Sequence, residues 1–216
     1  MTGTLEKVQA YIFDLDGTLY SQKKMHIKMA EELIRYYAIH PNRIKDIYYI
    51  WKFRKLREYR DNKQISINEL IGKMSSSEDK IKNIYGVIDR WMFKEPLKLI
   101  KSCAYEEVIN YIRKEKDKGK SIVIYSDYPV KDKLNALGLC ADIEVCAEDD
   151  NIKELKPSSK AMNYIMDRLN ADGSLVVYVG DRYEKDGESA RLSGVVYYDI
   201  HQFRKIIVTG EDNGQS

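Results

Sequence analysis

The chain has 216 residues, 44% hydrophobic and 32% charged, with a formal net charge of +2. These values are typical of a globular protein and argue against a disordered chain or a strongly basic nucleic-acid-binding protein. The sequence has no apolar run of about 18 residues and no signal-peptide pattern at its start, so we expect a cytoplasmic protein. Its three cysteines form no CxxC pair, which makes a zinc site improbable.

Five short apolar runs, rich in Val, Ile and Tyr, predict the buried strands of a parallel sheet. They are Gln9–Leu15, Ser121–Tyr125, Ile143–Ala147, Ser174–Val179 and Val195–Asp199. Stretches of helical period follow between them, at Tyr105–Lys116, Val130–Leu137, Pro157–Leu169 and Glu184–Leu192. This alternation predicts an α/β fold with a doubly wound, mostly parallel sheet.

The connection between the first two expected strands is far longer than the dozen or so residues that a crossover needs. It has helical period at Met25–Tyr37, at 41–60 and at Glu78–Phe93. We therefore expect a core part at 1–22, an all-helical insert at 23–95, a second core part at 96–209 and a polar tail at 210–216.

Charge is distributed unevenly between these parts. Residues 23–95 contain 17 Lys/Arg and 10 Asp/Glu, a net charge of +7, whereas the rest of the chain has a net charge of −5. The densest basic segment, at 52–60, includes Arg54 and Arg57. This segment either attracts an anionic substrate or is simply a solvated helix face.

The strongest chemical signal is the pair Asp14 and Asp16, which follows the first apolar run directly. Ligands bind at the carboxyl edge of open parallel sheets, and Gly17 allows the backbone to turn sharply there. The ordinary alternative is an acidic turn at a strand exit.

Polar residues also follow the next three strands. Ser126 follows the second strand, Lys156 the third, and Asp181 with Asp186 the fourth. A hydroxyl and an ammonium can hold phosphate oxygens, and carboxylates suit Mg²⁺. Each residue also has an ordinary interpretation when it is taken singly. Ser126 could be a turn serine, Lys156 a solvated lysine and Asp186 a capping aspartate.

In this order the residues resemble the four motifs of the haloacid dehalogenase-like (HAD) hydrolase superfamily. The motifs appear here as DLDGTL, the serine of VIYSD, the lysine of LKPS and the acids of GDRYEKD. The position of the insert resembles that of the helical C1-type cap of subfamily I.

The resemblance implies that Asp14 is the nucleophile, that Asp16 is the general acid and base, and that Ser126 and Lys156 hold the phosphoryl group. Asp127, next to Ser126, is counted with the phosphate-binding residues, although many relatives carry Asn there.

The same resemblance implies Mg²⁺ as the cofactor. Its expected site is formed by Asp14, Asp16, Asp181 and Asp186. Arg182 stands where small polar residues are common in the family.

These residues predict a Mg²⁺-dependent phosphatase that cleaves a small phosphate monoester through an aspartyl-phosphate intermediate. The expected partner is a phosphorylated metabolite, with neither nucleic acid nor membrane involved. Phosphomutase action is the alternative, because transfer and hydrolysis share these motifs. A metal-independent haloacid dehalogenase and a non-enzymatic binding protein that uses the basic segment are less favoured.

Overall fold

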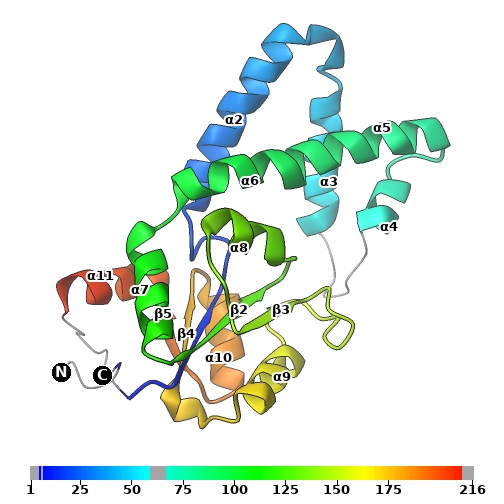
Figure 1. Cartoon of the computed structure of the whole chain (residues 1–216). Coiled ribbons are helices and arrows are strands. Elements are labelled where there is room, and N and C mark those ends of the chain that lie inside the picture. The colour runs from blue at the N-terminus through cyan, green and yellow to red at the C-terminus, as the bar shows by residue number, and fades with distance from the viewer. Residues whose placement is uncertain (1–4, 6, 59–66, 211–216) are drawn as a thin grey trace. The chain divides into compact units, whose positions relative to one another are not determined.

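The structure is a computed structural model that describes residues 5, 7–58 and 67–210 (Figure 1). The chain divides into two compact units, one formed by residues 22–103 and the other by the rest. We describe each unit by itself. Among the described residues, no helix is both long enough and apolar enough to cross a membrane.

The larger unit, which we call the core unit, is built on a five-stranded sheet in which all pairs are parallel. The strands are β1 Ala10–Phe13, β2 Ser121–Ser126, β3 Ile143–Cys146, β4 Val176–Gly180 and β5 Val196–Asp199. Their order is β3-β2-β1-β4-β5, so β1 is central. The chain places β2 and β3 on one side of β1 and then β4 and β5 on the other side. The expected α/β fold with a parallel sheet is confirmed.

Helices cover both faces of this sheet (Figure 1). Helices α7 (Glu106–Asp117) and α11 (Ile200–Thr209) pack against each other, as do α9 (Ser159–Leu169) and α10 (Glu188–Leu192). Helix α8 (Lys131–Leu137) follows β2 and ends at Gly138, whose φ of 66° is left-handed. Glycine adopts this conformation readily, which explains why the helix stops there.

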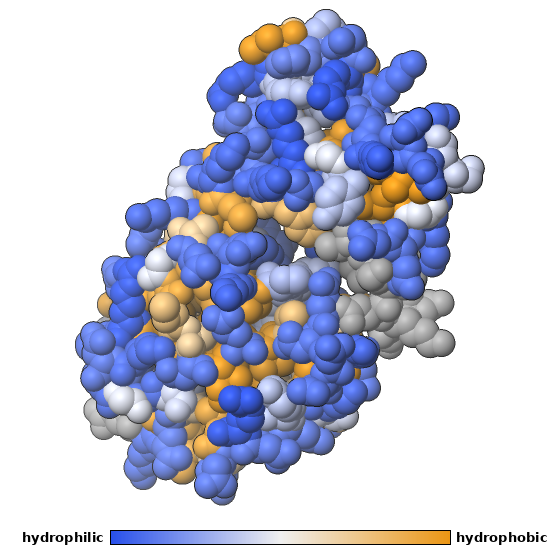
Figure 2. All heavy atoms as spheres, turned by 45° about the vertical axis from the view of Figure 1, so that its right-hand side comes forward, coloured by the Kyte–Doolittle hydropathy of each residue, from blue (hydrophilic) through white to orange (hydrophobic). Residues whose placement is uncertain are grey.

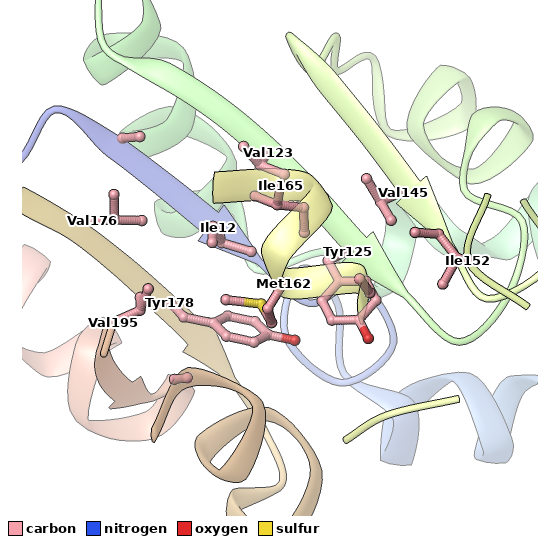
Figure 3. Packing of buried hydrophobic residues seen from close by; sticks show 13 residues of the cluster. Ile12, Val123, Tyr125, Val145, Ile152, Met162, Ile165, Val176, Tyr178 and Val195 are labelled. Atoms are coloured by element: carbon pink, nitrogen blue, oxygen red, sulfur yellow. The ribbon is translucent and has the colours of Figure 1, made fainter. Parts of the chain in front are cut away.

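One face of the sheet has an aliphatic core (Figure 3). Met162 and Ile165 of α9 pack over Ile12, Val123 and other buried strand residues. Because side chains alternate along a strand, Ile12 faces α9 while its neighbours in β1 face the opposite layer.

That opposite layer is aromatic. Phe203 of α11 is fully buried, and its ring centroid lies 5.2 Å from that of Tyr111 and 5.8 Å from that of Phe13. Tyr11 also contacts this group, with its ring centroid 5.6 Å from that of Tyr111. These rings attach α7 and α11 to the centre of the sheet.

Several element boundaries differ from the sequence expectation. Helix α11 was not expected, because it starts directly after β5, with Asp199 as the cap that accepts hydrogen bonds from the His201 and Gln202 N–H groups. The expected strand at Ser174 begins later, after a 3-10 turn η4 (Gly173–Leu175). Helix α9 begins at Ser159, two residues after the expected start at Pro157, and Ser158 caps it by accepting a hydrogen bond from the Ala161 N–H.

We call the unit formed by residues 22–103 the helical unit. All the regular secondary structure in its described residues is helical. The helices are α2 (Gln22–Ile39), η1 (Pro41–Arg43), α3 (Asp46–Glu58), α4 (Ile67–Gly72), α5 (Glu78–Ile88), the π-helix η2 (Asp89–Lys94), α6 (Glu95–Ile100) and η3 (Lys101–Cys103). Phe53, Leu70, Ile71, Ile84 and Ile88 form its core. Hydrophobic side chains also reach its surface (Figure 2), and they include the exposed Ile39 and Ile44.

Residues 96–103, which we assigned to the core from sequence, group with this helical unit. Pro96 lies in the first turn of α6, directly after the π-helix η2. The helical run from Glu78 therefore continues through Pro96 and does not end before it. Most of the expected polar tail, residues 211–216, lies outside the described part of the chain.

The aromatic layer generates a stability prediction. Replacing Phe203 with Ala removes a fully buried ring and leaves a cavity, so the free energy of unfolding should fall by about 3–5 kcal/mol. Val208→Ala on the same helix is the control, because Val208 is 70% exposed and should cost less than about 0.5 kcal/mol. Urea unfolding measures both, and equal small losses would contradict the packing described.

Candidate active site

Asp14 follows β1 at the carboxyl edge of the sheet and is buried. Its N–H donates to the Val179 carbonyl at 2.9 Å, which ties it to the end of β4. One carboxylate oxygen accepts a hydrogen bond from Lys156 Nζ at 2.6 Å, and the other accepts one from Thr18 Oγ1 at 3.1 Å. Burial raises the pKa of Asp14, and the attraction of Lys156 opposes this shift.

Lys156 comes from the segment between β3 and α9, and its side chain is 0% exposed. Its ammonium lies between two carboxylates, 2.6 Å from Asp14 Oδ1 and 2.8 Å from Asp186 Oδ1. It also lies 4.6 Å from the ring centroid of Tyr125 and 5.5 Å from that of Tyr178. Burial alone lowers the pKa of Lys156, but the neighbouring carboxylates outweigh it and raise the pKa above its usual value, so the group is a cation.

Asp186 lies in the π-helix η5 (Tyr183–Gly187) and is 0% exposed. Its Oδ1 accepts hydrogen bonds from Lys156 and, at 2.9 Å, from the Tyr178 hydroxyl, while its Oδ2 accepts one from the Arg182 N–H at 3.2 Å. Burial opposes ionisation, yet Lys156 and these donors lower the pKa of Asp186. Asp186 is therefore held as a carboxylate by the protein itself.

Asp181 stands at the end of β4 and completes an acidic group. One carboxylate oxygen each of Asp14, Asp181 and Asp186 lies within 4.8 Å of the others. Among the described residues, Asp181 Oδ1 is buried without a hydrogen-bond partner, and the ion pair with Arg182 Nε is long, at 3.5 Å. Burial raises the pKa of Asp181.

An orphaned carboxylate oxygen beside two other acids fits a divalent cation such as Mg²⁺, which prefers oxygen ligands. A cation at this position would also add positive charge, since among the described residues the three carboxylates outnumber the cations paired with them, Lys156 and Arg182.

Asp16, two residues after the candidate nucleophile, has a different environment. Both of its oxygens accept hydrogen bonds from Lys133 Nζ of α8, at 2.5 and 2.7 Å, and the Tyr20 hydroxyl donates to Oδ1. Its side chain is 15% exposed, against 3% for Asp14. The carboxylate of Asp16 is not part of the acidic group formed by Asp14, Asp181 and Asp186.

Ser126 ends β2 at the same sheet edge and Asp127 follows it, and both are buried. Ser126 Oγ accepts a hydrogen bond from the Tyr128 N–H at 3.2 Å, which leaves its own proton for an acceptor. Asp127 accepts from the Lys156 N–H at 2.8 Å and from Lys185 Nζ at 2.9 Å. Because both of its oxygens accept these hydrogen bonds, Asp127 is better suited to holding the Lys156 loop than to contacting a phosphate.

Sequence reasoning missed the residues that support these groups, namely Thr18, Tyr20, Lys133, Tyr178 and Lys185. Tyr125 and Tyr178 carried a usable signal, because each is the single aromatic residue, with a polar hydroxyl, of a buried strand whose other hydrophobic residues are aliphatic (Figure 3). Lys133 carried no such sequence signal, because it is one of several charged residues on a helix that is partly exposed to solvent.

Gly17 makes the approach of Asp181 to the loop after β1 possible. Its φ is +107°, and a Cβ at this position would lie 2.1 Å from Asp181 Oδ2. Any side chain there would push Asp181 away from Asp14 and Asp186, so glycine is needed both for the turn and for the acidic group.

The sequence matches the haloacid dehalogenase-like hydrolase family over residues 8–194. The chain therefore belongs to the HAD-like hydrolases, as the four motifs indicated. A comparison with curated protein sequences found no match.

Solved structures share this fold at low sequence identity. A 2-haloacid dehalogenase from Pseudomonas syringae pv. Tomato DC3000 has a TM-score of 0.62 at 18% identity, covering 94% of this chain and 100% of its own. A candidate β-phosphoglucomutase from Thermotoga maritima has a TM-score of 0.60 at 14% identity, covering 94% and 99%. A HAD phosphatase from Thermococcus onnurineus has a TM-score of 0.54 at 18% identity, covering 93% and 98%. These structures share the fold under three different enzyme names, so the fold alone does not indicate the activity.

The contact at Gly17 generates a second prediction. Gly17→Ala should weaken the binding of a divalent cation at this acidic group and lower hydrolase turnover at least about 100-fold, because the new methyl group displaces Asp181. Gly119→Ala is a matched control, since Gly119 also has a positive φ, of +84°, but no atom within 4 Å of the added carbon. Calorimetric Mg²⁺ titration and steady-state kinetics compare the two. Similar losses in both variants would show that backbone strain, and not the contact with Asp181, is responsible.

Proposed function

We propose that this HAD-like hydrolase is a Mg²⁺-dependent phosphatase that acts on a small phosphate monoester. The observation that carries the proposal is the buried pair of Asp14 and Lys156 at 2.6 Å, at the sheet edge where Asp181 and Asp186 also converge. A carboxylate in this setting is shielded from water and is oriented by Lys156 and Thr18, as a nucleophile must be.

In the proposed reaction, an oxygen of Asp14 attacks phosphorus and the bond between phosphorus and the ester oxygen breaks. Asp16 donates its proton to the departing alcohol. Asp16 then takes a proton from a water molecule that attacks the aspartyl-phosphate, which releases inorganic phosphate and restores Asp14. Ser126 and Lys156 hold the phosphoryl oxygens during both steps.

The residues that would hold Mg²⁺ are Asp14, Asp181 and Asp186, supported by the orphaned oxygen of Asp181. The bound ion supplies positive charge that reduces the repulsion between Asp14 and an anionic phosphate. Asp16 contributes no carboxylate to this group, because its oxygens are engaged by Lys133 and Tyr20.

The acidic group argues against the dehalogenase alternative, whose chemistry requires neither Mg²⁺ nor a general acid at position 16. The phosphomutase alternative uses the same groups and differs only in whether the phosphoryl group goes to water or to a sugar hydroxyl. A screen of phosphorylated metabolites, with inorganic phosphate and isomeric sugar phosphates both quantified, separates the two reactions.

We also propose that the helical unit is a cap that selects the substrate. Its position in the sequence, after the first motif, and the net charge of +7 over residues 23–95 support this role. Arg54 of α3 is exposed, whereas Arg57 is half-buried, so Arg54 is the better candidate for an anionic contact. Residues 59 and 60 of the basic segment lie outside the described part of the chain.

The nucleophile assignment leads to a third prediction. Asp14→Asn should lower kcat for 4-nitrophenyl phosphate by more than about 1000-fold, because the amide cannot form the aspartyl-phosphate. The fold should persist, since Asn keeps an acceptor for Lys156 and Asp186 still neutralises the ammonium. Asp150→Asn is the control for charge removal, because Asp150 is 95% exposed. Turnover near wild type in Asp14→Asn, with normal thermal unfolding, would refute the assignment.

Metal dependence gives a fourth prediction. Chelation of Mg²⁺ should abolish turnover, and Asp181→Ala should lower it at least about 100-fold, because the charge between Asp14 and phosphate is no longer offset. Mg²⁺ should also raise the free energy of unfolding of the wild type by about 2.7 kcal/mol at 100 times its Kd, and raise it much less in Asp181→Ala. Full activity in excess chelator would reopen the dehalogenase alternative.

A further inference from the structure

Each of the two carboxylates in the loop after β1 is held by one lysine and one hydroxyl. Asp14 has Lys156 and Thr18, and Asp16 has Lys133 and Tyr20. Lys156 belongs to a motif that the sequence revealed, whereas Lys133 lies on α8, 117 residues from Asp16, and belongs to none.

Lys133 contacts both oxygens of Asp16, at 2.5 and 2.7 Å, so it restricts rotation of the carboxylate as well as its position. The Tyr20 hydroxyl donates to Oδ1 of the same group. The backbone of the loop is also tied down, because Tyr20 forms bridges with Asp16 and with Ala104. The loop and α8 together therefore define where the Asp16 carboxylate points.

The exposure of the pair indicates that stability is not its main use. The side chains of Lys133 and Asp16 are 24% and 15% exposed, and ion pairs that solvent reaches contribute little to folding. A carboxylate that must transfer protons, by contrast, depends strongly on its orientation toward the reacting oxygen.

We propose that Lys133 is a positioning residue for proton transfer by Asp16. This inference rests on the proposed phosphatase function and adds a residue to it. Lys133 orients the carboxyl group of Asp16 toward the leaving-group oxygen. Asp16 alone touches the reacting atoms.

The test compares two esters whose leaving groups differ in their need for a proton. Phenyl phosphate releases phenoxide, which is basic enough for protonation to assist its departure, whereas 4-nitrophenyl phosphate releases a less basic anion that leaves without a proton. The value compared is kcat/KM, because it reports phosphoryl transfer to Asp14 and not the later hydrolysis of the aspartyl-phosphate.

In Lys133→Met, we expect kcat/KM to fall about 10- to 100-fold for phenyl phosphate and less than about 3-fold for 4-nitrophenyl phosphate. The loss should appear in kcat more than in KM, and Lys133→Arg should restore part of it. Lys131→Met is the matched control on the same helix, because Lys131 is exposed, and both esters should react as with wild type.

Equal losses on both esters, or no loss on either, would overturn the positioning role while leaving the phosphatase function intact. A loss confined to KM would overturn it too, since it would make Lys133 a substrate-binding residue. If the wild type cleaves neither ester in saturating Mg²⁺, the proposed function fails, and the role of Lys133 fails with it. Thermal unfolding of each variant shows that any change arises in a folded protein.

Discussion

The buried ammonium of Lys156 is the interaction on which the rest of the site depends. A fully buried cation is costly unless it is paired, and here two carboxylates, Asp14 and Asp186, lie within 2.8 Å of it. These three residues come from three separate segments of the chain. Asp14 follows β1, Lys156 lies in the loop before α9 and Asp186 lies in η5, so all three segments must be in place before the three charges pair with one another.

The surrounding core accommodates these charges at the edge of an otherwise apolar sheet. Tyr178 packs within the cluster beneath α9 while its hydroxyl donates to Asp186, so one side chain serves the core and the site (Figure 3). Gly17 leaves room for Asp181, which a methyl group would displace. Packing and chemistry thus constrain the same residues, and a substitution there affects both.

Asp14 and Asp16 show how two like residues in one loop acquire different surroundings. Asp14 is buried against a fully enclosed lysine, whereas Asp16 is partly exposed and paired with a lysine on a surface helix. An aspartate that attacks phosphorus benefits from exclusion of water, while one that exchanges protons with alcohol and water needs access to them. The two environments match the two proposed roles.

The sequence by itself determined the fold class, the family and the four motif positions, because strand-like apolar runs and the polar residues that follow them are local patterns. It did not predict α11, which follows β5 without a loop, or the continuation of helix through Pro96. Only the tertiary structure decided that Asp127 pairs with Lys185 and that Lys133 holds Asp16. Those partners lie 58 and 117 residues apart, and no local pattern encodes them. They meet because parallel strands bring their carboxyl ends to one edge of the sheet, where distant segments become neighbours.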